Sequence, residues 1–223
     1  MNKKILVIAP HNDDEILGCG GIMLKNKAEG NKVYVCIATH GTPPLFDPEG
    51  TKRNHQETLD CHKYIGVDNT IFLDFPAVFI DKTDRYKIND ELLRVIKKIQ
   101  PDEVYIPHYG DMQKDHQIVA DACMVALRPK YNHNFTKIYC YETLSETGWN
   151  IPSVQNEFIP NCYTDISEFV DKKLEAMSYY ESQLSDFPDA RSLEAVKALA
   201  RYRGAQMNMN AAEAFMLIRE IKH

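Results

Sequence analysis

The chain has no long hydrophobic run and no excess of positive charge, and both absences limit what it can do. None of its apolar stretches approaches the roughly 18 residues that a membrane-spanning helix needs. A formal net charge of −6 argues against a general nucleic-acid binder, which would carry a basic surface. The apolar stretch after Lys4 is too short for the hydrophobic region of a signal peptide. We therefore expect a cytoplasmic protein with no membrane span and no nucleic-acid partner.

Closely spaced cysteines are also missing. Six cysteines are dispersed along the chain without a C-x-x-C pair, namely Cys19, Cys36, Cys61, Cys123, Cys140 and Cys162. A structural zinc site needs ligands at short, regular spacing, and disulfide frameworks belong mainly to short secreted chains. Because most of these cysteines fall within apolar segments, we expect buried free thiols.

What the chain does contain is a regular alternation of apolar runs and helical patterns. Its composition of 44% apolar and 26% charged residues is typical of a globular protein. The predicted strands cover residues 4–9, 33–39, 70–73, 103–107 and 137–143, and the predicted helices cover 15–29, 53–65, 89–99 and 116–128. This order predicts an α/β fold with a Rossmann-like, doubly wound and mainly parallel sheet.

The last third of the chain has a different pattern. It predicts a helical C-terminal extension, with helices over residues 167–184, 192–205 and 211–221. No linker or repeat separates it from the rest, so we expect one domain over residues 1–223. Long loops are expected at residues 39–52, 74–87 and 144–158. The first two follow strand ends, which is where α/β sheets bind ligands.

One imidazole and three carboxylates stand within five residues, in the sequence PHNDDE at residues 10–15, directly after the first strand. Like charges crowded at a strand end repel one another and are costly to desolvate, and a divalent cation would remove that cost. Either Asp13 or Asp14 could instead cap the following helix. A cap explains one carboxylate and leaves the others unexplained.

A second cluster of histidine and aspartate, residues 108–116, follows the strand at 103–107. The two clusters would meet if these two strands are neighbours in the sheet. Together His11, Asp14 and His116 offer two nitrogens and one oxygen, which suits catalytic Zn²⁺ with one position left open. Mixed nitrogen and oxygen ligation also admits Fe²⁺, Co²⁺ or Mn²⁺. The sequence therefore predicts a metal site.

The two clusters resemble the motifs of the PIG-L/LmbE family of zinc-dependent N-deacetylases. The first family motif reads [A/P]-H-P-D-D-E, and here Asn12 replaces its proline. The second is commonly H-P-D-H-R or a variant ending in D-H, and residues 113–117 read QKDHQ. Weaker similarity at Arg53 and Glu57, at residues 141–145 and at 191–215 extends the resemblance over nearly the whole chain.

The resemblance implies a role for each motif residue. His11, Asp14 and His116 would hold the metal, and Asp13 would be the general base. Asp115 would orient a neighbouring histidine. The expected reaction is hydrolysis of the N-acetyl group of an amino sugar or a sugar nucleotide, in surface-polysaccharide synthesis. Because relatives often form symmetric oligomers, a homo-oligomer is a further expectation.

Gln113 departs from the family pattern, since many relatives carry histidine at its position. A glutamine can donate a neutral hydrogen bond to the reacting carbonyl but supplies neither positive charge nor a proton. His108 and Lys114 are candidate helpers for this role. The departure also leaves open a catalytically silent, sugar-binding relative.

Several arginines have two readings. Arg53 could bind a sugar hydroxyl or a phosphate, or pair with Glu57 on the same helix. Two more arginines, Arg191 and Arg203, could clamp a diphosphate, or pair with the helix residues Glu194 or Glu213.

Other candidates lie at loops and on a helix surface. The loop containing Trp149, with Glu142 at its start, could roof the site and contact substrate. His40 ends the second strand and could approach the same pocket. His55 and His62, on one helix, are expected to be solvated.

Two other enzyme classes remain to be separated. Gly18, Gly20 and Gly21 suggest a dinucleotide-binding oxidoreductase, but they fall inside the first helix rather than in the strand-to-helix turn. A metal-dependent phosphohydrolase also uses histidine and aspartate, although it usually needs two metals and more ligands.

Overall fold

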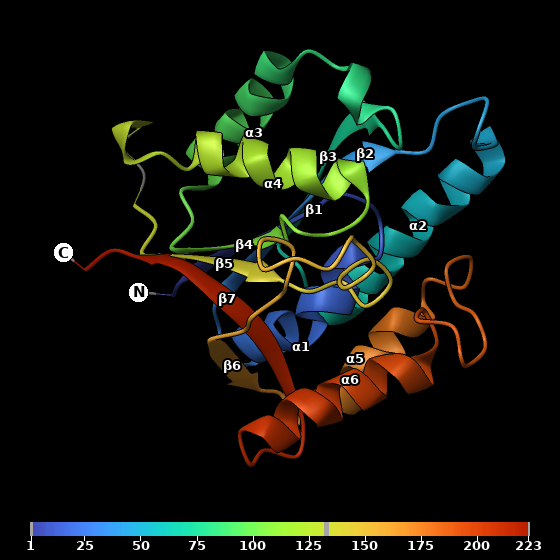
Figure 1. Cartoon of the computed structure of the whole chain (residues 1–223), viewed down its shortest axis with the longest axis vertical. Helices are drawn as coiled ribbons and strands as arrows, with labels where there is room; N and C mark the ends of the chain where they lie inside the picture. The colour runs from blue at the N-terminus through green and yellow to red at the C-terminus, as the bar shows by residue number, and fades with distance from the viewer. Residues whose placement is uncertain (1, 132–133, 223) are drawn as a thin grey trace.

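The computed structural model describes residues 2–131 and 134–222, and a seven-stranded sheet forms its centre (Figure 1). Its strands are β1 (Lys4–Ala9), β2 (Lys32–His40), β3 (Asn69–Pro76), β4 (Glu103–Pro107), β5 (Lys137–Tyr141), β6 (Cys162–Asp165) and β7 (Ala212–Glu220). Their order across the sheet is β3-β2-β1-β4-β5-β7-β6. The first five strands pair in parallel, whereas β7 runs antiparallel to both β5 and β6. The predicted mainly parallel, doubly wound sheet is confirmed.

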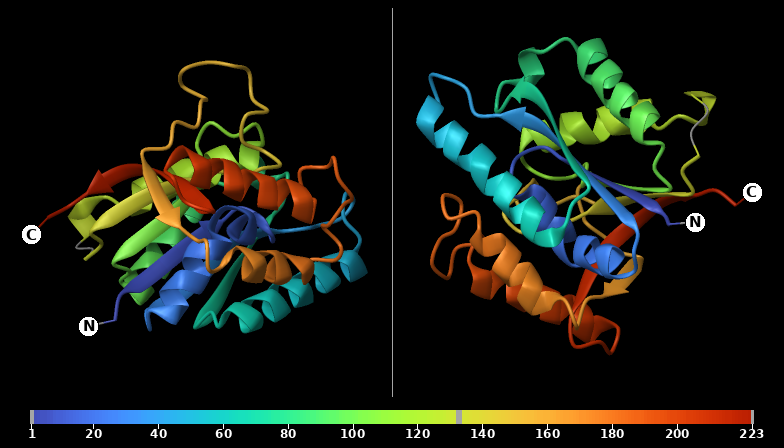
Figure 2. Two further views of the ribbon diagram at one scale, coloured as in Figure 1. Left: turned by 90° about the horizontal axis from the view of Figure 1, so that it is seen from below. Right: turned by 180° about the vertical axis from the view of Figure 1, so that it is seen from behind.

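Helices cover both faces of this sheet. They are α1 (Asp14–Ala28), α2 (Pro48–Ile65), α3 (Arg85–Ile99), α4 (Lys114–Ala126), α5 (Val170–Ser178) and α6 (Leu193–Gln206), with short 3₁₀ turns at Ile80–Lys82 and Pro129–Tyr131. Helices α1 and α2 lie on one face, and α3 and α4 lie on the other (Figure 1). Helices α5 and α6 pack outside α1, as the rear view in Figure 2 also shows. In residues 2–131 and 134–222 no helix is long and apolar enough to span a bilayer.

Strand β1 shows why the apolar runs are nearly continuous. Ile5, Val7 and Ala9 face the core under α1 and α2, while Leu6 and Ile8 face the core under α3 and α4. All five side chains are fully buried. A parallel strand covered on both faces needs apolar residues at every position. The six cysteines are free, and five of them are buried, as expected.

The C-terminal segment was predicted wrongly as a helix over 211–221, because it forms strand β7. Its residues pair with β5 on one side and with β6 on the other. The sequence AEAFMLIRE has apolar residues on both faces, which is typical of an inner strand and cannot be separated from a buried helix by pattern alone. Strand β6 was missed because it has only four residues, none of them buried.

Several helix boundaries also differ from the sequence prediction, and helix α3 begins at Arg85 rather than at residue 89. Helix α2 begins at Pro48 rather than at residue 53, because the Asp47 side chain accepts a hydrogen bond from the Gly50 N–H and Pro48 suits a first helical position. Helix α5 ends at Ser178 rather than at 184. Because α2 begins early, the first long loop, predicted over residues 39–52, is shorter than expected.

A buried ion pair between Glu213 on β7 and Lys173 on α5 bonds to backbone groups of α1 and so joins the three elements. Glu213 accepts hydrogen bonds from the N–H groups of Gly21 and Ile22, both at 2.7 Å. Lys173 Nζ donates to Glu213 and to the carbonyl of Leu17, again at 2.7 Å. A Cβ atom on Gly21 would lie 2.6 Å from the Ile166 side chain. The glycine at this position therefore permits close helix packing.

Candidate metal centre

The two histidine and aspartate clusters meet at one edge of the sheet. Strands β1 and β4 are parallel neighbours, so the turns that follow them leave the sheet at the same end. Helix α1 begins at Asp14 directly after the first turn, and α4 begins at Lys114 after the second. The condition set by the sequence, that these two strands be adjacent, is confirmed.

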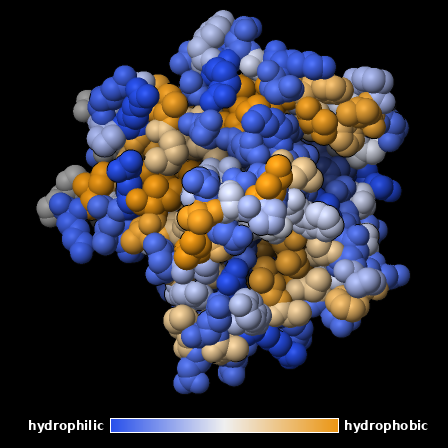
Figure 3. Space-filling model, in the orientation of Figure 1, coloured by the Kyte–Doolittle hydropathy of each residue, from blue (hydrophilic) through white to orange (hydrophobic). Residues whose placement is uncertain are grey.

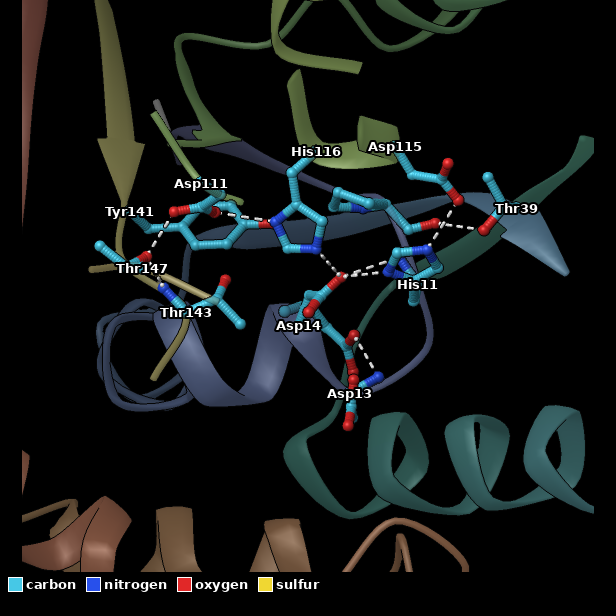
Figure 4. A network of polar contacts seen from close by, with 12 residues as sticks. His11, Asp13, Asp14, Thr39, Asp111, Asp115, His116, Tyr141, Thr143 and Thr147 are labelled. Atoms are coloured by element: carbon cyan, nitrogen blue, oxygen red, sulfur yellow. Dashed lines mark hydrogen bonds and ion pairs between the residues drawn. The ribbon is translucent and has the colours of Figure 1, made fainter. Parts of the chain in front are cut away.

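His11, Asp14 and His116 converge on one point (Figure 4). Asp14 Oδ2 lies 3.2 Å from His11 Nδ1 and 3.2 Å from His116 Nε2, and the three ligand atoms all lie within 4.8 Å of one another. Tetrahedral zinc with bonds of about 2.0–2.1 Å sets neighbouring ligand atoms about 3.3 Å apart. Asp14 Oδ1 and His116 Nε2 are buried without a hydrogen-bond partner. These three side chains therefore fit a divalent cation.

A carboxylate stands behind each histidine. His11 Nε2 lies 3.0 Å from Asp115 Oδ2, and His116 Nδ1 lies 2.8 Å from Asp111 Oδ2. Such contacts fix the ring orientation and leave the other nitrogen for the metal. The structure thus places Asp115 against His11, where an orienting group is expected. Sequence reasoning gave Asp111 no role, although its position five residues before a ligand was visible.

Both orienting carboxylates are themselves held. Asp111 Oδ1 accepts a hydrogen bond from the Thr147 hydroxyl at 2.6 Å, and that hydroxyl oxygen accepts the Thr143 N–H at 2.8 Å. Asp115 Oδ2 accepts the Val78 N–H at 2.6 Å. Two segments therefore contribute to holding the candidate metal ligands: the one after β4, which contains Asp111, and the one after β5, which contains Thr143 and Thr147 (Figure 4).

The charges in the site act strongly on one another. Burial alone would lower the pKa of His11, but hydrogen bonds to Asp115 and Asp14 raise it to about 9. Burial likewise opposes the charged form of His116, but Asp14 and Asp111 raise its pKa to about 10. Burial would raise the pKa of Asp14, and the two histidines instead hold it well below its usual range. Without a metal, the raised pKa values favour the protonated, positively charged forms of His11 and His116.

Asp13 lies beside the three ligands without joining them. Its backbone is left-handed, with φ of 97°, and its N–H donates to Glu15 Oε2 at 3.1 Å. Its own Oδ2 accepts a hydrogen bond from Arg191 Nε at 2.9 Å. Burial and the charge of Asp14 raise its pKa, Arg191 lowers it, and the result is about 7. A carboxylate with a pKa near neutrality can accept a proton during a reaction.

Glu15 anchors a buried polar network under Asp13. Its Oε1 accepts a hydrogen bond from the Tyr180 hydroxyl and lies 3.2 Å from His62 Nε2. His62 Nδ1 lies 2.7 Å from Thr70 Oγ1. The expectation that His62 is solvated was wrong: only 3% of it is exposed, because its face of α2 packs towards α1 and β3.

A cavity of about 430 Å³ opens beside the metal site. This volume is in the usual range for small-molecule sites, roughly 300–1,000 Å³. Among the residues named from sequence, seven line it, namely His11, Asn12, Asp13, His40, Arg53, Gln113 and Arg191. Ser182 and Gln183 line it too and, like Arg191, come from the segment between α5 and α6, so the C-terminal region contributes to the site.

The structure shows which carboxylates Arg191 and Arg53 contact. Arg191 pairs with Asp13 rather than with Glu194 or Glu213, so the proposed helix pairing was wrong. Arg53 Nε lies 3.8 Å from Glu57 Oε1, which is the surface pair weighed from sequence, and its side chain is 67% exposed.

Three other residues named from sequence do not line this cavity. His108 is fully buried with Nε2 3.1 Å from the Asn156 carbonyl oxygen. Lys114 is exposed and donates to Gln117. Glu142 accepts two hydrogen bonds from Arg203, at 2.8 and 2.7 Å. The structure thus brings neither candidate helper of Gln113 to the cavity.

Glu146 is a cavity residue that sequence reasoning did not single out. It is 9% exposed and lies in the segment between β5 and β6, which stands out from the rest of the chain in Figure 2. The only signal in the sequence was its place in a long loop. Trp149 is 71% exposed. Figure 3 shows that hydrophobic residues gather in separate patches on the face of the molecule that it draws.

Comparison with known proteins agrees with this site. Residues 6–127 match the family model of PIG-L, described as GlcNAc-PI de-N-acetylase. The uncharacterised deacetylase YaiS of Escherichia coli K12 is 29% identical over 189 residues, covering 81% of this chain and 91% of YaiS. The diacetylchitobiose deacetylase of Thermococcus kodakarensis is 25% identical over 226 residues, covering 97% of this chain and 83% of that protein.

A solved structure has the same fold. The N,N'-diacetylchitobiose deacetylase of Pyrococcus horikoshii superposes with a TM-score of 0.80 at 20% identity, covering 97% of this chain and 84% of that chain. The family model spans more than half of the 223 residues and includes all three candidate metal ligands. The chain therefore belongs to the PIG-L family of de-N-acetylases.

Proposed function

We propose that this chain is a metal-dependent deacetylase of small molecules that contain N-acetylglucosamine. One observation carries the proposal: a His–Asp–His metal site and a separate carboxylate, Asp13, lie together at a cavity. Similarity to a diacetylchitobiose deacetylase and to probable N-acetyl-glucosaminyl malate deacetylases supports the sugar class. Acetate and a free amino sugar are the proposed products.

The metal would be held by His11, Asp14 and His116. A bound divalent cation would polarise the amide carbonyl and lower the pKa of water in the site. Two nitrogens and one oxygen favour Zn²⁺, and Fe²⁺, Co²⁺ or Mn²⁺ can also use this donor set. A phosphohydrolase with two metals has less support, because His11, Asp14 and His116 are the single candidate group found in the described part of the chain.

The protein's own residues then move the protons. Asp13 takes a proton from the attacking water as the water oxygen bonds to the carbonyl carbon, and Arg191 orients the Asp13 carboxylate. When the carbon–nitrogen bond breaks, the proton held by Asp13 passes to the leaving nitrogen. Gln113 lines the cavity and can donate a hydrogen bond to the carbonyl oxygen.

We further propose that the substrate is a sugar nucleotide used in surface-polysaccharide synthesis. His40 and Arg53 both line the cavity. Each lies 3.8 Å from one carboxylate oxygen, His40 from Asp74 and Arg53 from Glu57, which is longer than a hydrogen bond. The Nδ1 atom of His40 is buried without a hydrogen-bond partner. A planar guanidinium suits phosphate oxygens, so these two side chains can receive a diphosphate.

An acetate-release screen tests both proposals. The zinc-loaded protein is incubated with N-acetylglucosamine, N,N'-diacetylchitobiose and UDP-N-acetylglucosamine, with and without a chelator, beside bis(4-nitrophenyl) phosphate. We expect chelator-sensitive acetate release, fastest from the nucleotide sugar. Phosphodiester cleavage without acetate release would contradict the deacetylase proposal, and a zinc-loaded protein inactive on every compound would indicate a silent relative. Faster release from the uncharged sugars would overturn the nucleotide proposal alone.

A further inference from the structure

Glu146 is an exception among the buried carboxylates of the described chain. Its carboxylate makes no hydrogen bond or ion pair with the described part of the protein, although only 9% of the residue is exposed. Every other buried carboxylate has at least one such partner, namely Asp13, Asp14, Glu15, Glu57, Glu103, Asp111, Asp115 and Glu213. The Glu146 carboxylate lines the cavity with no partner from the protein, so it is free to accept a hydrogen bond from a ligand bound there.

Backbone hydrogen bonds hold the turn that carries Glu146. Its N–H donates to the Thr143 carbonyl at 2.8 Å, and its carbonyl accepts the Trp149 N–H at 3.3 Å. The next residue, Thr147, is tied to Asp111 behind the metal site. The turn therefore holds the Glu146 side chain at the cavity that Asp13 also lines.

The charges around Glu146 place it near the metal centre without making it a ligand. Burial raises the pKa of its carboxyl group, while the positive charges of His116 and Arg191 act to lower it. Yet Glu146 does not join the group whose ligand atoms lie within 4.8 Å of one another. Asp13 also lines the cavity without joining this group, but its carboxylate already accepts a hydrogen bond from Arg191.

We propose that Glu146 is a substrate-binding residue that accepts a hydrogen bond from a hydroxyl group of the N-acetyl sugar. This inference rests on the proposed deacetylase function and specifies how the sugar is held. A hydroxyl is the donor that such a sugar offers close to its acetamido group, and a bond to a carboxylate is stronger than one to a neutral acceptor. The bond orients the ring while the acetamido group lies at the metal centre.

The test pairs protein variants with deoxy sugars. Acetate release is measured for N-acetylglucosamine and its 3-deoxy, 4-deoxy and 6-deoxy analogues, using the unaltered protein and Glu146→Gln. In the unaltered protein, loss of one particular hydroxyl should lower kcat/KM about 10- to 100-fold. In Glu146→Gln that single penalty should shrink about tenfold, with the other two unchanged. Equal penalties in both proteins would overturn the proposal.

Two further measurements exclude a structural or ligand role. Zinc content should stay the same in Glu146→Gln, and loss of zinc would identify a metal ligand instead. The melting temperature without substrate should stay the same, because the Glu146 carboxylate has no partner in the protein to lose; a fall with equal loss on every substrate would indicate a structural role. Glu157→Gln, an exposed carboxylate of the same segment, is the matched control and should change none of these values. No acetate release by the unaltered protein from these sugars or from any compound of the screen would contradict the proposed function, and the inference would fall with it.

Discussion

Three consecutive acidic residues at the start of α1 each have their own set of partners. Asp13 faces Arg191, Asp14 faces His11 and His116, and Glu15 faces Tyr180 and His62 on the other side of the turn. The left-handed backbone of Asp13 lets neighbouring side chains point in different directions. Aspartate and asparagine adopt this conformation more readily than most residues.

Asp13→Asn tests the assignment of the base. Asparagine accepts the same backbone and can still accept the hydrogen bond from Arg191, but it cannot take up a proton. We expect kcat for acetate release to fall about 100- to 10,000-fold with unchanged zinc content. Steady-state kinetics and metal analysis on the same sample provide the check. Turnover equal to that of the unaltered protein would remove Asp13 from this role.

Zinc affinity should depend steeply on pH. In the metal-free chain the pKa of His11 is about 9 and that of His116 is about 10, so both rings carry protons near neutrality. Metal binding needs neutral imidazoles, so protons compete with zinc and acidification weakens binding. Between about pH 6.5 and about pH 8.5 the zinc affinity should rise by up to about 100-fold per pH unit, measured by competition with a chelator. A flat profile would show that these histidines do not bind the ion.

The sequence was sufficient to predict that the three candidate metal ligands come together, and insufficient to predict the residues that contact them. His11 and Asp14 are three positions apart in one turn, and His116 opens the helix after a neighbouring strand, so strand order alone brings them together. The partner of Glu15, by contrast, is a histidine 47 residues away on a different helix. The cavity position of Glu146 depends in the same way on the tertiary fold.

At the scale of elements, α1 is held by charges from two other elements. Glu213 on β7 and Lys173 on α5 bond to α1 backbone groups in mid-helix, where the chain has Gly20 and Gly21. The glycines that resembled a dinucleotide-binding motif therefore lie at a packing contact. This junction fixes the helix whose first residue, Asp14, is a candidate metal ligand.

Lys173→Met should destabilise the fold strongly. It leaves Glu213 charged and uncompensated at a site where both side chains are only 4% exposed. Removing one partner of a buried pair typically costs about 3–5 kcal/mol. Urea unfolding should show this loss, and adding Glu213→Gln should recover part of it. Lys197→Met, which breaks an exposed pair with Asp171, should change stability by less than about 1 kcal/mol.

Strand β7 shows why element type was harder to predict than element order. Its apolar residues fit an inner strand and a buried helix equally well, and only pairing with β5 and β6 decides between them. The first five strands were simpler, because each βα unit repeats the same short pattern. Non-local antiparallel pairing leaves no local signal of this kind.

At the scale of the whole molecule, the sheet places distant segments at one edge. The turns after β1 and β4 supply the candidate metal ligands, the segment after β5 supplies Thr147 and Glu146, and the segment between α5 and α6 supplies Arg191. Ligand sites at the carboxyl ends of parallel strands are the rule for open α/β sheets. The C-terminal extension is therefore part of the site.

Metal removal and restoration tests the central claim most directly. The protein is stripped with a chelator, its zinc content is measured, and acetate release from an N-acetylglucosamine compound is followed before stripping, after it, and after zinc is added back. We predict that activity disappears with the metal and returns at about one zinc per chain, and that His116→Ala fails to recover. Acetate release that continues at the same rate in verified metal-free protein would contradict the account.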